Sequence, residues 1–153
     1  GKVVVNGWLA IPSGFSAEVM AQCGFDSVTV DIQHGVQDYQ SMVTCFQAMQ
    51  AHPVTPMVRV PWNEPGIIGR ALDMGAMGII IPMVNSKAEA EAAVAACRYA
   101  PAGSRSMGPI VPMQRYGTSY FASANEKVIC IPMIETGTAT NGIIVERTSR
   151  KNR

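Results

Sequence analysis

Three short apolar segments of this chain each lead into polar side chains of types that carry out chemistry. The first ends at Asp31 and is followed by His34, the second ends at Arg59, and the third leads into Glu135. An imidazole can act as a general base, a guanidinium can bind a carboxylate, and a carboxylate can ligate a hard divalent cation. Because the carboxyl ends of parallel strands meet at one edge, parallel pairing of these segments would bring the side chains together.

His34 is the stronger candidate of the two histidines. His52 precedes Pro53 at a predicted helix end and is most simply a surface residue, whereas His34 follows a predicted buried strand. Asp31, three residues before His34, is placed to orient the imidazole and raise its basicity. A purely structural strand-end histidine is the alternative.

Arg59, Glu135 and Asp73 each have two interpretations. Arg59 lies between two valines, and a buried guanidinium must pair with an anion, which could be a protein carboxylate or a substrate carboxylate. Glu135 alone at a strand end suits Mg²⁺ or Mn²⁺, which proteins often hold with one or two carboxylates plus water and substrate oxygens. Asp73, at a helix end before a glycine, is by default a surface acid.

The elements that would position these residues alternate between strand and helix. We expect strands near residues 3–11, 27–32, 55–60, 78–83 and 127–134, and helices near 15–23, 39–51, 65–74 and 87–97. This alternation favours parallel βαβ units. No strand is followed by GxGxxG, and polar residues close several strands in turn, which favours a barrel over an open doubly wound sheet.

The length predicts an incomplete barrel. A complete (β/α)8 TIM barrel takes roughly 250 residues, whereas this chain has 153. We therefore expect an α/β half-barrel of about five to six parallel strands, with residues 1–136 as the partial barrel domain and 137–153 as a divergent C-terminal tail, in which 142–146 could be one more strand. Residues 99–125 are expected to form a long loop.

Composition excludes several classes of partner. The net charge is +1 with acids and bases interspersed, so nucleic acid and anionic membranes are not expected partners. The four cysteines show no CxxC spacing, and no secretion signal or apolar run of about 18 residues is present, which favours a cytoplasmic protein with reduced thiols. An open barrel exposes strand edges and apolar surface, so we expect a homo-oligomer, a dimer or larger.

Several ordered motifs over roughly residues 5–136 make the chain similar to a known family. They are Gly7–Leu9, Gly24–Asp26, Val30–Gly35, Val58–Asn63, Ala71–Ala76, Ile81–Val84, Cys97–Gly108 and Met133–Thr136. The chain resembles the 4-hydroxy-2-oxoheptanedioate and 2-dehydro-3-deoxyglucarate aldolases. These metal-dependent enzymes cleave 4-hydroxy-2-oxo acids to pyruvate and an aldehyde.

The resemblance implies a role for each candidate: His34 as the general base, Asp31 and Asp73 as its acidic helpers, Arg59 as the anchor of the pyruvate unit, Trp8 as a wall of the pocket, and Glu135 as a ligand of Mg²⁺ or Mn²⁺. Two departures accompany it. Gln33 stands where many relatives have Glu, and no residue of 138–153 matches the Gly-Pro-Ala-Asp-type segment that carries the family's second metal ligand.

Three functions follow from these observations. The first is a metal-dependent aldolase, active or residually so, in which a partner chain closes the barrel. The second is a catalytically inert half-barrel that self-associates. A related barrel lyase acting on phosphoenolpyruvate-like or acyl-CoA substrates ranks last, because no long basic tract for a CoA phosphate is present.

Overall fold

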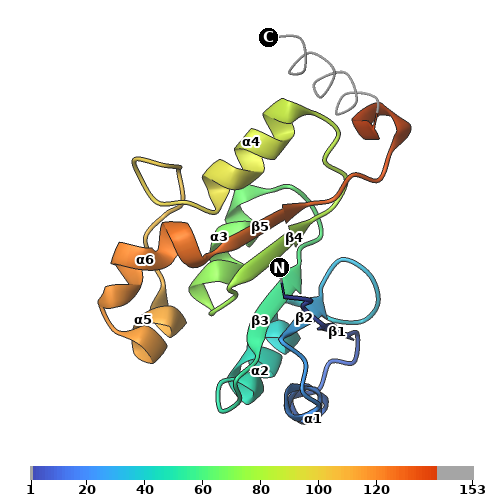
Figure 1. Ribbon diagram of the computed structural model, residues 1–153, viewed down its shortest axis with the longest axis vertical. Helices are drawn as coiled ribbons and strands as arrows, with labels where there is room; N and C mark the ends of the chain where they lie inside the picture. The colour runs from blue at the N-terminus through green and yellow to red at the C-terminus, as the bar shows by residue number, and fades with distance from the viewer. Residues whose placement is uncertain (1, 141–153) are drawn as a thin grey trace.

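Strands and helices alternate along most of the chain in the computed structural model, which describes residues 2–140. The strands are β1 (Asn6–Leu9), β2 (Ser27–Asp31), β3 (Thr55–Arg59), β4 (Gly78–Ile81) and β5 (Ile129–Pro132). The helices are α1 (Gly14–Gln22), α2 (Tyr39–Met49), α3 (Pro65–Asp73), α4 (Lys87–Ala96), α5 (Ile110–Tyr116) and α6 (Ser119–Lys127). Figure 1 shows that the five strands of the described part form the centre of the molecule, with helices around them.

Each strand pairs in parallel with the next strand along the chain. The sheet order within residues 2–140 is β1-β2-β3-β4-β5, and every pairing is parallel. An open doubly wound sheet reverses its strand order at a switch point, and no reversal occurs among these strands. The prediction of an α/β half-barrel is therefore confirmed, with five strands in the described part.

Side-chain caps start the helices that follow β1 to β4. Ser13, Asp38, Glu64 and Ser86 each lie just before a helix and accept hydrogen bonds from its first backbone N–H groups. Such caps accept hydrogen bonds from the first N–H groups of a helix, which have no carbonyl acceptor within the helix. Each cap follows its strand within a few residues, so the connections at the carboxyl ends of the strands are short and fixed.

The two faces of the sheet differ in their environment. Alternate side chains of a strand point to opposite faces, and those on the helix-covered face, such as Val30, Val58 and Ile79, are fully buried. On the other face, Ile129 and Ile131 of β5 remain 48% and 39% exposed, and Trp8 of β1 is 44% exposed. Both edges of the described sheet thus carry apolar side chains that lie uncovered on the face corresponding to a barrel interior.

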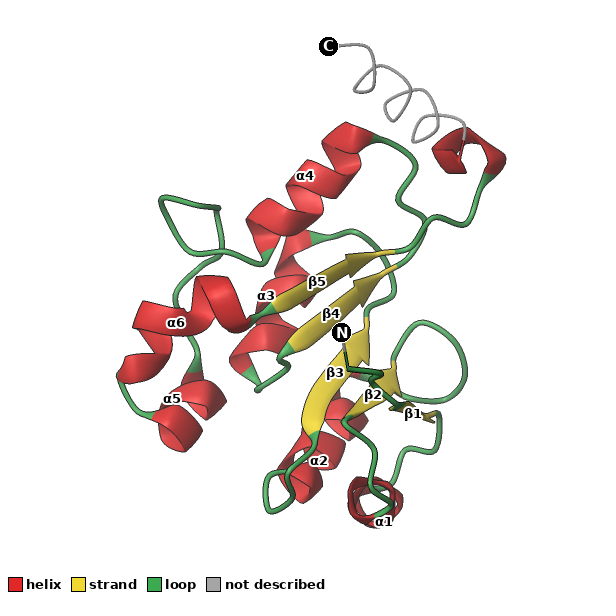
Figure 2. Cartoon of the chain, viewed as in Figure 1, coloured by secondary structure: helices red, strands yellow, loops and turns green. Residues whose placement is uncertain are grey.

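The expected loop over residues 99–125 was wrong, because its second half folds into α5 and α6 (Figure 2). The second of these short helices, α6, contacts Arg105, whose side chain is fully buried. The Arg105 guanidinium donates to Asp73 and to the Tyr120 hydroxyl, each at 3.0 Å, and lies over the Tyr99 ring at 4.4 Å. These contacts join residues far apart in the sequence, so local periodicity did not reveal them.

The segment after Glu135 begins with a helical turn. Residues 137–140 are helical, and the Thr136 hydroxyl accepts a hydrogen bond from the Ala139 N–H at 3.2 Å. This turn continues the alternation of strand and helix at the point where we expected a divergent tail to start. The further strand expected at residues 142–146 lies outside the described residues.

Within residues 2–140 no helix is long and apolar enough to cross a membrane. All four cysteines are free thiols, in agreement with the sequence-based expectation.

Replacing Tyr120 by phenylalanine should weaken the contact between α6 and Arg105. The change removes the hydroxyl that accepts the Arg105 bond in a fully buried site, and a hydrogen bond to a charged group contributes about 2 kcal/mol. We expect the free energy of unfolding, measured with urea, to fall by about that amount. Tyr116→Phe is the matched control, since Tyr116 is 40% exposed; equal effects of the two changes would contradict the assigned role of the Arg105 contact.

Candidate active site

The candidate site lies at the carboxyl ends of β1, β2 and β3. Asp31 and Arg59 are the last residues of neighbouring strands and face each other in register. Trp8 on β1 pairs with Thr29, two residues before Asp31, so alternation puts its side chain on the same face of the sheet as Asp31. Parallel pairing therefore brings three of the sequence-predicted residues together.

Asp31 is the centre of this group. Its carboxylate accepts both Nε and Nη2 of Arg59, the former at 3.0 Å, and the indole N–H of Trp8 at 3.2 Å. It also accepts the backbone N–H groups of Gln33 and His34 at 3.1 and 3.2 Å. Burial alone would raise the pKa of Asp31, but Arg59 and the other donors outweigh it and lower this pKa to about 2. The carboxylate is therefore charged at neutral pH.

Arg59 pairs with a protein carboxylate, which answers one question the sequence left open. Its side chain is only 14% exposed, and its guanidinium carbon lies 4.9 Å from the centre of the Trp8 ring. Asp31 uses Nε and Nη2. Within residues 2–140, no protein acceptor binds Nη1, so this nitrogen can donate to a ligand anion.

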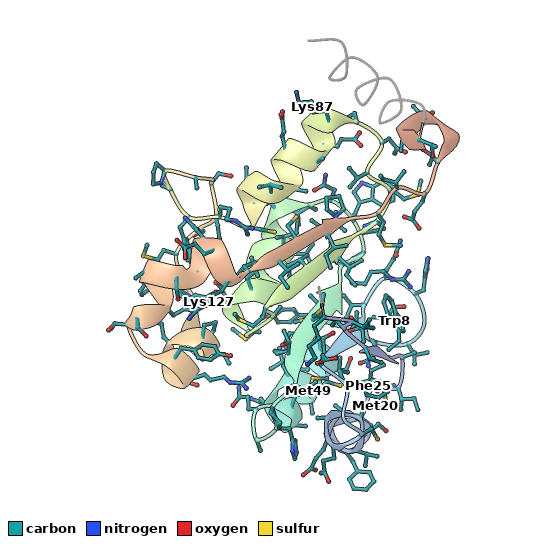
Figure 3. The ribbon with its side chains drawn as sticks, viewed as in Figure 1. Trp8, Met20, Phe25, Met49, Lys87 and Lys127 are labelled. Atoms are coloured by element: carbon teal, nitrogen blue, oxygen red, sulfur yellow. The ribbon has the colours of Figure 1, made fainter. Side chains whose placement is uncertain are left out.

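His34 lies in the loop between β2 and α2 and is exposed. Asp31 holds it through its backbone N–H, and the imidazole has no hydrogen-bond partner within residues 2–140. The expectation that Asp31 orients the imidazole ring was therefore wrong for this structure, in which Asp31 bonds only the backbone N–H of His34 and orients the loop that carries it. Figure 3 shows Trp8 beside this loop.

Gln37 supports the same loop, and the sequence analysis did not single it out. Its side chain is buried, and its amide nitrogen donates to the carbonyl of Ile11 at 2.9 Å and to that of Leu9 at 3.4 Å. It thus ties the loop that carries His34 to the loop that follows Trp8. A polar residue between Val36 and the helix cap Asp38 was the only signal in the sequence.

Glu135 lies beyond the end of β5 and is exposed. Its Oε2 accepts the backbone N–H of Met83 at 2.8 Å, and the neighbouring Thr136 hydroxyl donates to the Asn85 side chain. Asn85 in turn donates to the Met83 carbonyl at 2.8 Å. These bonds join the loops after β4 and β5 at the same edge of the sheet as Arg59.

The described residues fit part of a metal centre. No group of three His, Cys, Asp or Glu side chains that could hold a metal ion occurs within residues 2–140. Glu135 offers one carboxylate at the correct edge, with Oε1 unpaired in the described part of the chain. Glu135 is therefore a described carboxylate that could contribute to a site for Mg²⁺ or Mn²⁺.

The structure does not bring Asp73 to this site. Asp73 ends α3, and a helix that returns antiparallel to the strands ends near their amino ends, opposite the edge that carries His34. There its carboxylate accepts the Arg105 bond; burial raises the pKa of Asp73, while Arg105 opposes that rise. The assignment of Asp73 as a helper of His34 rests on the family resemblance alone.

Known proteins are similar to this chain in both sequence and fold. The model of the HpcH/HpaI aldolase/citrate lyase family matches residues 7–144. A hydroxypyruvate/pyruvate aldolase of Rhizorhabdus wittichii is 41% identical over 94% of this chain and 57% of its own length. A 4-hydroxy-2-oxo-heptane-1,7-dioate aldolase of Salmonella dublin is 36% identical over 94% of this chain and 56% of its own length.

A solved structure supports the relationship. An HpcH/HpaI aldolase/citrate lyase family protein from Burkholderia cenocepacia J2315 superposes with a TM-score of 0.82 and 29% identity, covering 92% of this chain and 58% of its own. This chain spans a little over half the length of the relatives it matches. The family model covers most of this chain, and both relatives are more than 30% identical to it: the chain belongs to the HpcH/HpaI aldolase/citrate lyase family.

Proposed function

We propose that this chain supplies the proton-transfer and carboxylate-binding half of a metal-dependent aldolase. The reaction is the reversible cleavage of a 4-hydroxy-2-oxo acid to pyruvate and an aldehyde. The single observation that carries the proposal is the buried Asp31–Arg59 pair, which leaves Arg59 Nη1 without a protein acceptor in the described part, beside the loop that bears His34. The names of the two aldolase relatives support the reaction class.

In this proposal each residue has one task. Arg59 binds the carboxylate of the 2-oxo acid through Nη1, and Asp31 holds the guanidinium in place. The Trp8 ring forms a wall beside the bound pyruvate unit. His34 accepts the proton of the 4-hydroxyl group as the bond between C3 and C4 breaks, and the electron pair of that bond forms the enolate of pyruvate. The proton then passes from His34 to C3 of the enolate, which gives pyruvate.

Glu135 is the proposed metal ligand of this half. A bound Mg²⁺ or Mn²⁺ would supply Lewis-acid stabilisation of the negative charge that develops on the 2-oxo oxygen. The family resemblance implies a second protein ligand from a Gly-Pro-Ala-Asp-type segment, which no residue of 138–153 matches.

Glu135→Gln tests the metal assignment directly. The change keeps an acceptor for the Met83 N–H but removes the negative charge, so we expect the dissociation constant for Mn²⁺, measured by electron paramagnetic resonance, to rise by about tenfold or more. Glu126→Gln is the control, because Glu126 is an exposed acid on α6. Equal Mn²⁺ binding by the wild-type protein and Glu135→Gln would contradict the assignment.

We further propose that the chain self-associates as a homo-oligomer, a dimer or larger. The support is the exposure of Trp8, Ile129 and Ile131 at the two edges of the described sheet, since uncovered strand edges and apolar surface favour association. Light scattering should give a mass above that of the single chain. A monomeric mass over a wide concentration range would contradict self-association.

The function itself is tested by pyruvate release. The purified chain is mixed with Mn²⁺ and 4-hydroxy-2-oxoheptanedioate, and pyruvate is followed with lactate dehydrogenase and NADH. A second arm adds the carboxyl-terminal part of the Rhizorhabdus wittichii relative that this chain does not cover. Pyruvate in either arm supports the aldolase; its absence from both arms, with the chain folded by circular dichroism, refutes it.

An inert, self-associating half-barrel is the second candidate. The specific observation in its favour is that the described residues contain no group of three metal-ligating side chains. It predicts a stable oligomer that neither takes up Mn²⁺ nor releases pyruvate. Measurements of Mn²⁺ uptake and of pyruvate release therefore distinguish the inert half-barrel from the aldolase.

A further inference from the structure

The loop after β4 contains the only non-glycine residue with a positive φ within residues 2–140. Met83 has a φ of 56°, in the left-handed region that residues with a β-carbon seldom adopt. Such a conformation persists only where the surrounding contacts hold it, and it is common at functional sites. Met83 lies two residues beyond the end of β4, at the edge of the sheet that carries Arg59. The contacts that hold Met83 are therefore expected to serve a task at this edge.

The Asn85 side chain holds the turn at Met83. Its amide nitrogen donates to the Met83 carbonyl at 2.8 Å, and its oxygen accepts the Thr136 hydroxyl. The Asn85 backbone N–H donates to Glu89 Oε2 at 2.6 Å, and Glu89 lies in the first turn of α4. Asn85 is half-buried and is thus fixed between α4 and the loop after β5. Figure 2 shows the loops after β4 and β5 running side by side.

The left-handed turn determines where the Met83 N–H points. This N–H donates to Glu135 Oε2 at 2.8 Å, whereas the next N–H, that of Val84, donates to the Met133 carbonyl at 3.1 Å. A hydrogen bond to a charged carboxylate is stronger than one between neutral groups. The Met83 bond fixes one oxygen of Glu135, and Oε1 has no partner in the described part of the chain.

We propose that Asn85 is a positioning residue for Glu135. It keeps Met83 in the left-handed conformation, so that the Met83 N–H holds Oε2 of Glu135 while Oε1 remains free for a divalent cation. This inference rests on the proposed function, which assigns Glu135 as a ligand of Mg²⁺ or Mn²⁺. Hydrogen bonds that orient a metal ligand matter for affinity, and their removal typically weakens metal binding by roughly 10–100-fold.

Amide hydrogen exchange, followed by nuclear magnetic resonance, tests the support of Met83 without any metal. The Met83 N–H should exchange slowly in the wild-type chain. Asn85→Ala should accelerate this exchange by about tenfold or more, because the turn that aims the N–H at Glu135 is no longer held. The Met133 N–H, which donates to the Ile81 carbonyl at 2.8 Å, is the internal reference and should keep its rate. Equal protection of Met83 in both proteins would overturn the proposal.

Mn²⁺ binding to the full chain, measured by electron paramagnetic resonance, tests the consequence for Glu135. Asn85→Ala should raise the dissociation constant by about tenfold or more. Asn63→Ala is the matched control, because Asn63 is also half-buried at this edge and donates to a backbone carbonyl, that of Glu89, at 3.0 Å. Asn63→Ala should bind Mn²⁺ as the wild-type chain does. Equal losses in the two asparagine variants would overturn the proposal.

Adding Met83→Gly to Asn85→Ala separates positioning from a general loosening of the loop. Glycine adopts a positive φ without the cost that a β-carbon imposes, so the double variant should bind Mn²⁺ more tightly than Asn85→Ala alone. No recovery would count against the role of the left-handed turn.

The two measurements also distinguish this proposal from the function on which it rests. If the wild-type chain took up no Mn²⁺, the assignment of Glu135 as a metal ligand would fail. Hydrogen exchange at Met83 would still decide whether Asn85 positions the Glu135 carboxylate.

Discussion

Replacing His34 by alanine is expected to slow pyruvate release by about 10²–10⁴-fold, the usual contribution of a positioned general base. The imidazole is exposed and has no hydrogen-bond partner in the described part of the chain, so the fold should not depend on it. Arg59 still binds the substrate carboxylate in this variant, and the loss should therefore fall on kcat with little change in KM. Steady-state rates from the coupled lactate dehydrogenase assay provide the measurement.

The matched control is His52→Ala. His52 lies just beyond the end of α2, away from the edge of the sheet where the strands have their carboxyl ends. Its Nε2 is 3.9 Å from the Glu18 carboxylate. This change should leave kcat and KM unaltered. If the His34 and His52 variants released pyruvate at the same rate, His34 would not be the base.

Asp31→Asn should produce the largest loss of stability of any single change in the site. The carboxylate is 5% exposed and holds the 14% exposed Arg59, and removing one partner of a buried ion pair leaves an uncompensated charge. We expect the free energy of unfolding at pH 7 to fall by about 3 kcal/mol. Glu126→Gln, which removes an exposed carboxylate, should change it little.

Adding Arg59→Met to Asp31→Asn should recover part of this loss, because no buried charge then remains. Urea unfolding followed by circular dichroism distinguishes the two variants. If adding Arg59→Met lowered the free energy of unfolding of Asp31→Asn by as much as Arg59→Met does alone, the two residues would not be coupled.

The same pair predicts how stability depends on pH. The pKa of Asp31 in the folded protein is about 2, below its ordinary value of 3.8. Because the pKa of Asp31 is lower in the folded than in the unfolded protein, its ionisation stabilises the fold. This contribution to the free energy of unfolding is fully present when the pH is above the unfolded-state pKa, and it is lost as the pH falls toward 2. The difference corresponds to about 2 kcal/mol, so the gap in stability between wild type and Asp31→Asn should narrow by that amount from pH 6 to pH 2.

Much of the fold could be predicted because each local signal agreed with the global arrangement. Glu64 and Pro65 mark the start of α3, and Ser86 and Glu89 that of α4, each after an apolar strand. The helices α5 and α6 escaped prediction, and α6 is held by the bond between Tyr120 and the buried guanidinium of Arg105, which also pairs with the distant Asp73. Their formation is a tertiary effect that no single window contains.

The sequence predicted which side chains of the site lie together where those side chains are at the ends of neighbouring parallel strands. Parallel pairing alone brings Asp31 beside Arg59, but the sequence could not decide which anion the guanidinium meets. Asp73 shows the opposite case: its place at a helix end before a glycine indicated a surface acid, and only the resemblance assigned it to the site. Gln37 was missed because its role depends on two backbone carbonyls of another loop.

The unbroken strand order has a consequence for how the protein is made on the ribosome. Each new strand needs only the strand synthesised immediately before it, so β1 to β4 can add to the growing sheet as they emerge. The exception is the last pairing, between Gly78 and Ile129, whose partners are the furthest apart in sequence of any strand pair in residues 2–140. Until α5 and α6 have left the exit tunnel, nascent chains expose the β4 edge, and chaperone contacts should concentrate on that interval of synthesis.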